Sequence, residues 1–211
     1  MSQTEHLQQA RSRALAIRSK YSLTTPRVMV SDLKRILKAE GVSLIEYSDR
    51  FRSTHLKGAY FNDRAGITVV INGKIRSVTE LLVFTLGHEL KHHLMDPVDE
   101  NYACVLGNEN HLLEAGANAF AAELVFPSQV FRMQMTRYGI GAGRCTPDNI
   151  VRLKHESKTT LSHMALAVRA EQLGYATHDS LKRVAWNTLR DRLYPEYTHY
   201  RRSRNTGRKY I

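Results

Sequence analysis

The pentapeptide His88-Glu89-Leu90-Lys91-His92 carries the residue types with the clearest capacity for chemistry. Two histidines four residues apart lie one above the other on a helix, so both imidazoles can reach one metal ion. At about 100° per residue, Glu89 lies between them around the helix axis, where its carboxylate can take a proton from a water beside the metal. This pattern predicts His88 and His92 as metal ligands and Glu89 as the catalytic base. The adjacent His93 points away from the pair and is predicted to be a surface residue.

A third metal ligand is expected further along the chain, because a catalytic zinc site usually takes three protein ligands. The candidate ligands are Asp96, Asp99, Glu100, Glu109, His111 and Glu114. Glu114 is preferred because it begins an alanine-rich helix that can return and pack against the first one. Asn118 follows one turn later on the same face, where it could hydrogen-bond the second nitrogen of a ligand histidine. His111 remains the alternative ligand.

A single helix, residues 77–95, must position the two histidines. Ser77 followed three residues later by Glu80 predicts a capping box at its start. Asp96-Pro97 predicts its end, because the residue before a proline avoids the helical region. The apolar residues that predict a largely buried helix are Leu81, Leu82, Phe84 and Leu86. The alternative is a helix whose histidines face solvent beside Lys91.

The remaining chain is predicted to form short helices around a small sheet. Before the motif, the pattern predicts helices at 4–20 and 27–39, a strand at 42–47, a loop at 48–57, and a strand pair at 56–60 and 67–72. The first helix is expected to place on one side Leu7, Ala10, Ala14, Leu15 and Ile17. After the motif, helices are predicted at 114–125, 128–138, 147–156, 160–173 and 180–193.

The glycines Gly139, Gly141 and Gly143 predict a flexible connector between two parts of the chain. The expected organisation is a domain at 1–138, a helical segment at 139–194 packed on it, and a basic tail at 195–211. Within the segment, helices 147–156 and 160–173 resemble a helix-turn-helix in length and spacing.

Composition places the 211-residue chain among ordinary globular proteins, with 42% hydrophobic and 24% charged residues. No apolar run approaches the roughly 20 residues that a membrane span needs, and the N-terminus has no apolar core of the signal-peptide type. Cys104 and Cys145 form no C-x-x-C motif. These features predict a cytoplasmic protein.

The net charge of +11 is concentrated towards the C-terminus. Residues 182–211 contain nine Lys or Arg against two Asp or Glu, a net charge of +7. Such a basic tail is typical of contact with nucleic acid or another acidic surface, and the alternative is a solvated tail without a partner.

Two segments together, FTLGHELKH and EAGANAFAAELVFP, resemble the paired motifs of the ImmA/IrrE family of bacterial and phage metallopeptidases. That pattern is HExxH followed by E-x-x-A-N-x-F-A-x-x-L-x-x-P. The second motif is met here by Glu114, Ala117, Asn118, Phe120, Ala121, Leu124 and Pro127. The resemblance covers about residues 25–175. Family members often have Gly before the second histidine, whereas this chain has Lys91, which is expected to put a cation at the rim of the site.

The resemblance implies an α+β, zincin-like fold with a small antiparallel sheet and a mostly helical remainder. It also implies a gluzincin-like site in which His88, His92 and Glu114 hold Zn²⁺ and Glu89 is the base. The implied function is a zinc-dependent hydrolase, an endopeptidase that cleaves a specific cytoplasmic protein. A helix-turn-helix repressor is the expected substrate, which would make the protein a regulator of transcription on a phage or mobile element.

A substrate strand could pair with an exposed edge at 56–60 or 67–72, and Tyr60 could stabilise the oxyanion.

Two alternative functions remain open. One alternative function is a DNA-associated regulator that uses residues 147–173 and the basic tail, with a structural metal site. The other is a metal-binding chain that has lost peptidase activity and acts by interaction.

Overall fold

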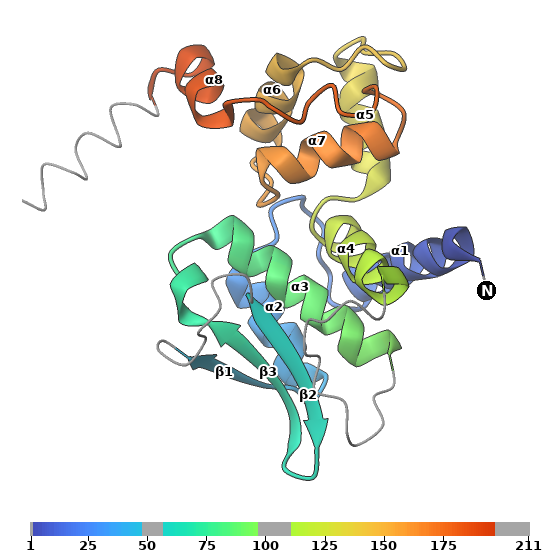
Figure 1. The fold of residues 1–211 in the computed structure, drawn as a ribbon, viewed down its shortest axis with the longest axis vertical. Coiled ribbons are helices and arrows are strands. Elements are labelled where there is room, and N and C mark those ends of the chain that lie inside the picture. The colour runs from blue at the N-terminus through green and yellow to red at the C-terminus, as the bar shows by residue number, and fades with distance from the viewer. Residues whose placement is uncertain (1, 48–56, 97–110, 197–211) are drawn as a thin grey trace, which may run out of the picture. The chain divides into compact units, whose positions relative to one another are not determined.

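The computed structural model describes residues 2–47, 57–96 and 111–196 (Figure 1). Several predicted features therefore lie outside the described residues: most of the loop 48–57, the candidate ligands Asp99, Glu100 and Glu109, Cys104, and the basic tail beyond residue 196.

The chain forms two compact units. The first contains Met1–Val130 together with Thr159–Leu161, and the second contains Phe131–Lys158 together with Ser162–Ile211. Helix α5 (Ser128–Arg137) runs through the junction at residue 130, eight residues before the expected boundary at 138. The fold is mostly helical with one small sheet, so the α+β class is confirmed.

Helix α1 (Gln3–Lys20) confirms the predicted N-terminal helix. Ser2 and Glu5 form a reciprocal capping box at its start. Leu15, expected on the same side as Ala10, Ala14 and Ile17, is 47% exposed, whereas those three are buried. The buried polar residues of this helix are His6 and Arg18. Arg18 donates a 2.6 Å hydrogen bond to the backbone carbonyl of Leu124, and this bond ties α1 to a helix 106 residues away in sequence.

The sheet contains β1 (Ser43–Tyr47), β2 (Gly58–Asp63) and β3 (Gly66–Asn72) in the order β1-β3-β2. β2 and β3 form the predicted antiparallel hairpin. β1 pairs with β3 in parallel, so the prediction of an antiparallel sheet was wrong. The pattern of apolar residues identifies strands, but it does not encode the direction in which a distant strand joins the sheet. Residues 67–72 form the central strand, so they are not an edge.

Two helices pack on the sheet, α2 (Val30–Ala39) beside β1 and α3 (Thr79–Met95) beside β2 (Figure 1). α2 begins three residues later than predicted, with Met29 as its N-cap. A short 3₁₀ helix, Gly73–Ile75, leads into α3.

Helix α3 ends at Met95 as predicted, but its start was predicted wrongly. Val78 is the N-cap and no side chain caps the helix, so Ser77 and Glu80 form no capping box. The preceding turn explains this difference, because the Val78 amide donates to the carbonyl of Ile75. The chain thus enters the helix one residue beyond Ser77.

Helix α4 (His111–Val125) packs against both α3 and α1. It begins three residues before the predicted start at Glu114. The alanine-rich helix packs against α3 as expected, and the two approach closely: a β-carbon added to Gly87 of α3 would lie 3.4 Å from the Cβ of Ala121. This contact fixes the spacing of the two helices that carry the predicted site.

The second unit contains α6 (Pro147–Ser157), α7 (His163–Gln172) and α8 (Trp186–Leu193) in addition to most of α5. Thr146 caps α6 through a capping box with Asn149. Ser162 caps α7, which begins at His163, three residues after its predicted start. The predicted helix 180–193 forms only from Trp186 onward. None of the described helices is long and apolar enough to cross a membrane.

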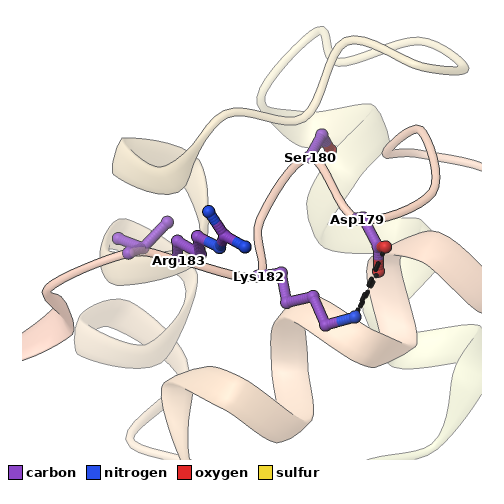
Figure 2. Close-up of a pocket in the computed structure, with 5 residues that line it drawn as sticks. Asp179, Ser180, Lys182 and Arg183 are labelled. Atoms are coloured by element: carbon purple, nitrogen blue, oxygen red, sulfur yellow. Dashed lines mark hydrogen bonds and ion pairs between the residues drawn. The ribbon is translucent and has the colours of Figure 1, made fainter.

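A small pocket of about 400 Å³ lies in the second unit (Figure 2). Its lining residues are Asp179, Ser180, Lys182, Arg183 and Val184. Lys182 forms an ion pair with Asp179 at 3.3 Å, so part of its charge is already compensated. The pocket includes none of the residues that the sequence predicts for catalysis.

A buried histidine of the second unit should make that unit sensitive to acid. His163 stacks on Trp186 with ring centroids 5.7 Å apart, and its burial, aided by the charges of Lys154 and Arg190, lowers its pKa to about 4. In the unfolded chain this pKa is about 6.5. Below pH 6.5 the unfolded state therefore binds a proton that the folded state rejects. The stability contributed by neutral His163 should fall by up to about 3 kcal/mol between pH 6.5 and pH 4.

Urea unfolding followed by the fluorescence of Trp186, the single tryptophan, measures this loss directly. A His163→Phe variant should keep the aromatic stack and lose much of the acid sensitivity. His178→Asn is the matched control because the His178 side chain is 90% exposed, and it should titrate like the wild type. Equal acid sensitivity in His163→Phe and wild type would contradict the assignment.

Candidate metal centre

Two packed helices bring together three of the residues that the sequence predicts for a metal site. His88 and His92 come from α3, and Glu114 comes from the first turn of α4. The Nε2 atoms of the histidines lie 3.2 Å apart. The carboxylate oxygens of Glu114 lie 3.3 Å from Nε2 of His88 and 3.6 Å from Nε2 of His92. One ligand atom from each residue can be chosen so that all three lie within 4.8 Å of one another.

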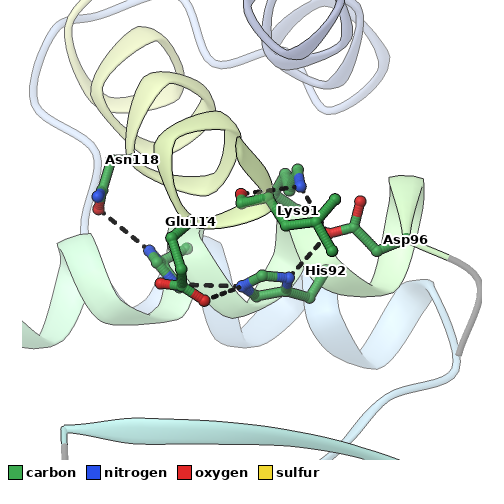
Figure 3. A network of polar contacts seen from close by, with 7 residues as sticks. Lys91, His92, Asp96, Glu114 and Asn118 are labelled. Carbon is green, nitrogen blue, oxygen red and sulfur yellow. Dashed lines mark hydrogen bonds and ion pairs between the residues drawn. The ribbon is translucent and has the colours of Figure 1, made fainter. Parts of the chain in front are cut away.

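The other ring nitrogen of each histidine faces an oxygen acceptor (Figure 3). Nδ1 of His88 lies 3.2 Å from Oδ1 of Asn118, which is the hydrogen bond expected for Asn118. Nδ1 of His92 lies 2.8 Å from Oδ2 of Asp96. In a neutral imidazole, an acceptor at Nδ1 favours the tautomer with its proton there, and the lone pair of Nε2 is then directed at the cluster. Asp96, one of the candidate third ligands, therefore contacts the Nδ1 side of the His92 ring, and Nε2 is the ring nitrogen that faces the cluster.

The environment of the cluster is asymmetric. The His92 side chain is buried, whereas that of Glu114 is 43% exposed, so the cluster opens to solvent beside Glu114. Burial alone would lower the pKa of His88, but the hydrogen bond that His88 donates to Glu114 and the charges of Glu89 and Glu114 outweigh it and raise this pKa. The hydrogen bond to His88 in turn lowers the pKa of Glu114. The contacts of Glu114 with both histidines hold the three candidate metal ligands together.

Glu89 lies on the inner side of α3, where it is 5% exposed. Burial raises the pKa of Glu89 against the opposing charges of His88 and His92. A raised pKa brings a carboxylate closer to the range in which a general base works near neutral pH. The backbone of β2 passes beside this carboxylate, since a β-carbon at Gly58 would lie 2.9 Å from its Oε1 atom.

Gly58→Ala should disturb this arrangement. The added methyl group would lie 2.7 Å from Cγ2 of Thr85 and 2.9 Å from Oε1 of Glu89, so β2 must move away or Glu89 must be displaced. We expect a loss of about 1–3 kcal/mol in the free energy of unfolding, measured by urea denaturation with circular dichroism. Gly141→Ala is the control, because a β-carbon at that glycine meets nothing within 4 Å. Equal stability of the two variants would show that β2 yields freely.

Lys91 does not lie at the rim, as the sequence predicted, but is fully buried. Its Nζ atom donates to Oδ2 of Asp96 at 2.5 Å and to the carbonyl of Leu113 at 3.1 Å. Its side chain passes Gly116 on α4, where a β-carbon would lie 2.4 Å from Nε2 of His6 and 3.2 Å from Cε of Lys91. The prediction failed because it considered α3 alone, and α4 covers this face of the helix.

His93 and Tyr60 also differ from expectation. His93 is half-buried rather than on the surface, and its ring lies between the Tyr60 hydroxyl at 3.2 Å and the backbone carbonyl of Glu40 at 3.1 Å. Tyr60 is 2% exposed and its hydroxyl is engaged with His93. This arrangement gives no support to Tyr60 as an oxyanion donor.

His111, the alternative third ligand, is an exposed residue at the start of α4 and is not part of the cluster. Asp96 is a site residue whose role the sequence did not assign. Its spacing of four from His92 is the signal that could have identified the contact. A second group with metal-ligand chemistry, Glu171, His178 and Asp179, lies in the second unit. It is mostly exposed, and its histidine already approaches both carboxylates at 3.7 Å.

Two imidazoles and a carboxylate converge from packed helices, with a buried glutamate next to one of them, and these are residue types that hold zinc in metallopeptidases. Residues 48–166 match the family model described as the IrrE N-terminal-like domain, a peptidase family. The match covers more than half of the chain, and the protein belongs to this family. The predicted resemblance is thereby confirmed, and the family supports peptidase activity with a protein as substrate. No curated protein matches the chain.

Proposed function

We propose that this protein is a zinc-dependent endopeptidase that cleaves a specific protein. One observation carries the proposal: Nε2 of His88, Nε2 of His92 and the Glu114 carboxylate converge, while both Nδ1 atoms are engaged elsewhere. Side chains arranged in this way can bind a metal ion between them.

The donor set fits zinc in a catalytic role. Two imidazoles and one carboxylate form a known three-ligand set that leaves a fourth position open. The partly exposed side of Glu114 would give water and substrate access to that position. When bound by His88, His92 and Glu114, zinc would supply Lewis-acid chemistry that polarises the scissile carbonyl and makes water more acidic.

The chain's own residues would perform the proton transfers. Glu89 would accept a proton from the attacking water and then deliver it to the nitrogen of the leaving amine. Its burial next to β2 would keep the carboxylate from being hydrated as it is in bulk water. Asn118 and Asp96 would hold the two imidazole rings in place through their Nδ1 atoms.

The substrate backbone would bind along β2. None of the described strands pairs with the outer edge of β2, whereas β3 is paired on both sides. An extended peptide can add to such an edge through main-chain hydrogen bonds. Because Gly58 of β2 lies next to Glu89, a peptide bound there would pass near the proposed base.

The substrate that the family resemblance suggests is a helix-turn-helix repressor in the cytoplasm, so that cleavage would change transcription. The described part of the second unit does not favour direct DNA reading. The exposed face of α7 presents Met164 at 44% and Val168 at 46% exposure, one turn apart. Apolar side chains of this kind suit contact with protein better than contact with base edges or phosphates.

Zinc content and cleavage together test the proposal. Purified protein should bind one zinc per chain by elemental analysis, and should cleave the repressor encoded beside it into discrete fragments. A zinc chelator should stop cleavage, and added zinc should restore it. Salt-sensitive DNA binding by a protein that binds no zinc would instead support the DNA-associated regulator. Stoichiometric zinc without cleavage of any candidate repressor would contradict the proposed substrate.

A further inference from the structure

We propose that Lys91 is a positioning residue that links the two helices of the metal site and holds the ring of His92 in its metal-binding orientation. This inference rests on the proposed function for its metal, but its contacts are a property of the chain itself. The sequence suggested only a cation at the rim of the site, and no role in orienting a ligand.

The first contact of Lys91 acts on His92. Lys91 and His92 both donate to the same atom, Oδ2 of Asp96, at 2.5 and 2.8 Å. Asp96 is the C-cap of α3, so its side chain would otherwise be free to turn towards water. The ammonium group holds the carboxylate on the Nδ1 side of the imidazole. His92 can then keep its Nδ1–H bond to Asp96 and present Nε2 to the cluster.

The second contact acts on the Glu114 segment. Nζ of Lys91 donates to the backbone carbonyl of Leu113, the residue immediately before Glu114. The side chain thus crosses from α3 to the first turn of α4 and passes close to Gly116. A single buried cation therefore contacts the supports of two of the three proposed ligands, one on each helix (Figure 3).

A buried ammonium group is expensive to desolvate, so a purely packing role would be served better by an apolar side chain. Burial of Lys91 is tolerated because its charge is paired and hydrogen-bonded at two points. A second lysine of the same unit, Lys34, shows the contrast. Lys34 pairs with Glu46 at 2.7 Å while its own side chain remains 45% exposed, and that pair touches no proposed ligand.

The test compares Lys91→Met with Lys34→Met, which removes the same charge from the surface. The zinc dissociation constant, measured against a competing chelator, should rise by about 10–100-fold in Lys91→Met. It should be unchanged in Lys34→Met. In metal-free protein, nitrogen NMR of the His92 ring should show a single Nδ1–H tautomer in the wild type and in Lys34→Met. Lys91→Met should show a mixture with the Nε2–H form.

Removing Lys91 alone leaves Asp96 buried beside His92 without its cation, and this variant could fail to fold. The double variant Lys91→Met/Asp96→Asn removes both charges and keeps an oxygen acceptor near His92. We expect it to fold and to bind zinc about 10-fold more weakly than Asp96→Asn alone, which keeps the contact of Lys91 with the Leu113 carbonyl. If the folded variants bind zinc like the wild type and keep a single His92 tautomer, Lys91 is structural only and the inference is overturned.

Failure of the proposed function can be distinguished from failure of the inference about Lys91. A wild-type protein that binds no zinc would contradict the proposed function. The tautomer of His92, measured without metal, would still decide whether Lys91 orients that ring.

Discussion

Replacing Glu89 with glutamine should abolish peptide cleavage and leave both the fold and zinc binding in place. Glutamine has nearly the size of glutamate, so it fits between α3 and Gly58 of β2. Its amide cannot accept the proton that the attacking water must lose. Loss of a general base typically lowers the rate by about 10²–10⁴-fold. Burial raises the pKa of Glu89, which means that its charge is disfavoured in the folded state. The neutral variant should therefore be at least as thermally stable as the wild type.

Three measurements on the same preparation decide this prediction: zinc per chain, the midpoint of thermal unfolding, and the rate of cleavage of the substrate repressor. Glu80→Gln, in the first turn of the same helix, is the matched control and should cleave normally. Wild-type cleavage by Glu89→Gln would remove Glu89 from the mechanism. Loss of zinc along with activity would show that Glu89 acts on the metal site and not as a base.

Glu114→Ala should give a mostly metal-free protein, the second large effect that the structure predicts. The carboxylate of Glu114 lies within 3.6 Å of the Nε2 atoms of both histidines, so its removal takes away one of three converging donors. Asn118→Ala should bind the metal more weakly, by about 10–100-fold, because Asn118 touches only the far nitrogen of His88. The two variants should therefore separate clearly in zinc content after dialysis against a zinc buffer.

His111→Ala is the control for this series, since His111 is an exposed residue three positions before Glu114. It should load with metal like the wild type. The ligand assignment fails if His111→Ala strips the metal and Glu114→Ala retains it. Equal losses in Glu114→Ala and Asn118→Ala would mean that the position of the His88 ring limits affinity more than the third donor does.

The sequence predicted the features that depend on neighbours within one or two helical turns. The spacing of His88 and His92 is local, so their shared face followed from helix geometry alone. The predicted helix 147–156 is likewise present, and the local pair Thr146 and Asn149 caps its start. Glu114 and Asn118, one turn apart, also lie on one face of their helix, and both contact His88.

Features that depend on distant segments were not predictable in this way. Lys91 is buried because α4 covers it, and His93 is held by Tyr60 and Glu40, which are far from it in sequence. A charged or polar residue on a helix is expected to face water unless a particular partner is known. The parallel direction of β1 likewise depends on how it joins β3, which no local pattern records.

The hydrogen bond from Arg18 to the carbonyl of Leu124 has a consequence for the order in which the protein is built. It joins residues 106 positions apart, and α1 packs along α4 around it. The ribosome delivers α1 first and α4 much later, so α1 must wait for most of the first unit to emerge. Contacts between such distant segments also form slowly, because a long loop must close before they are gained. A nascent chain would therefore hold the two histidines of α3 before it has Glu114 in place, and the three converging side chains would be complete only once α4 has docked on α3.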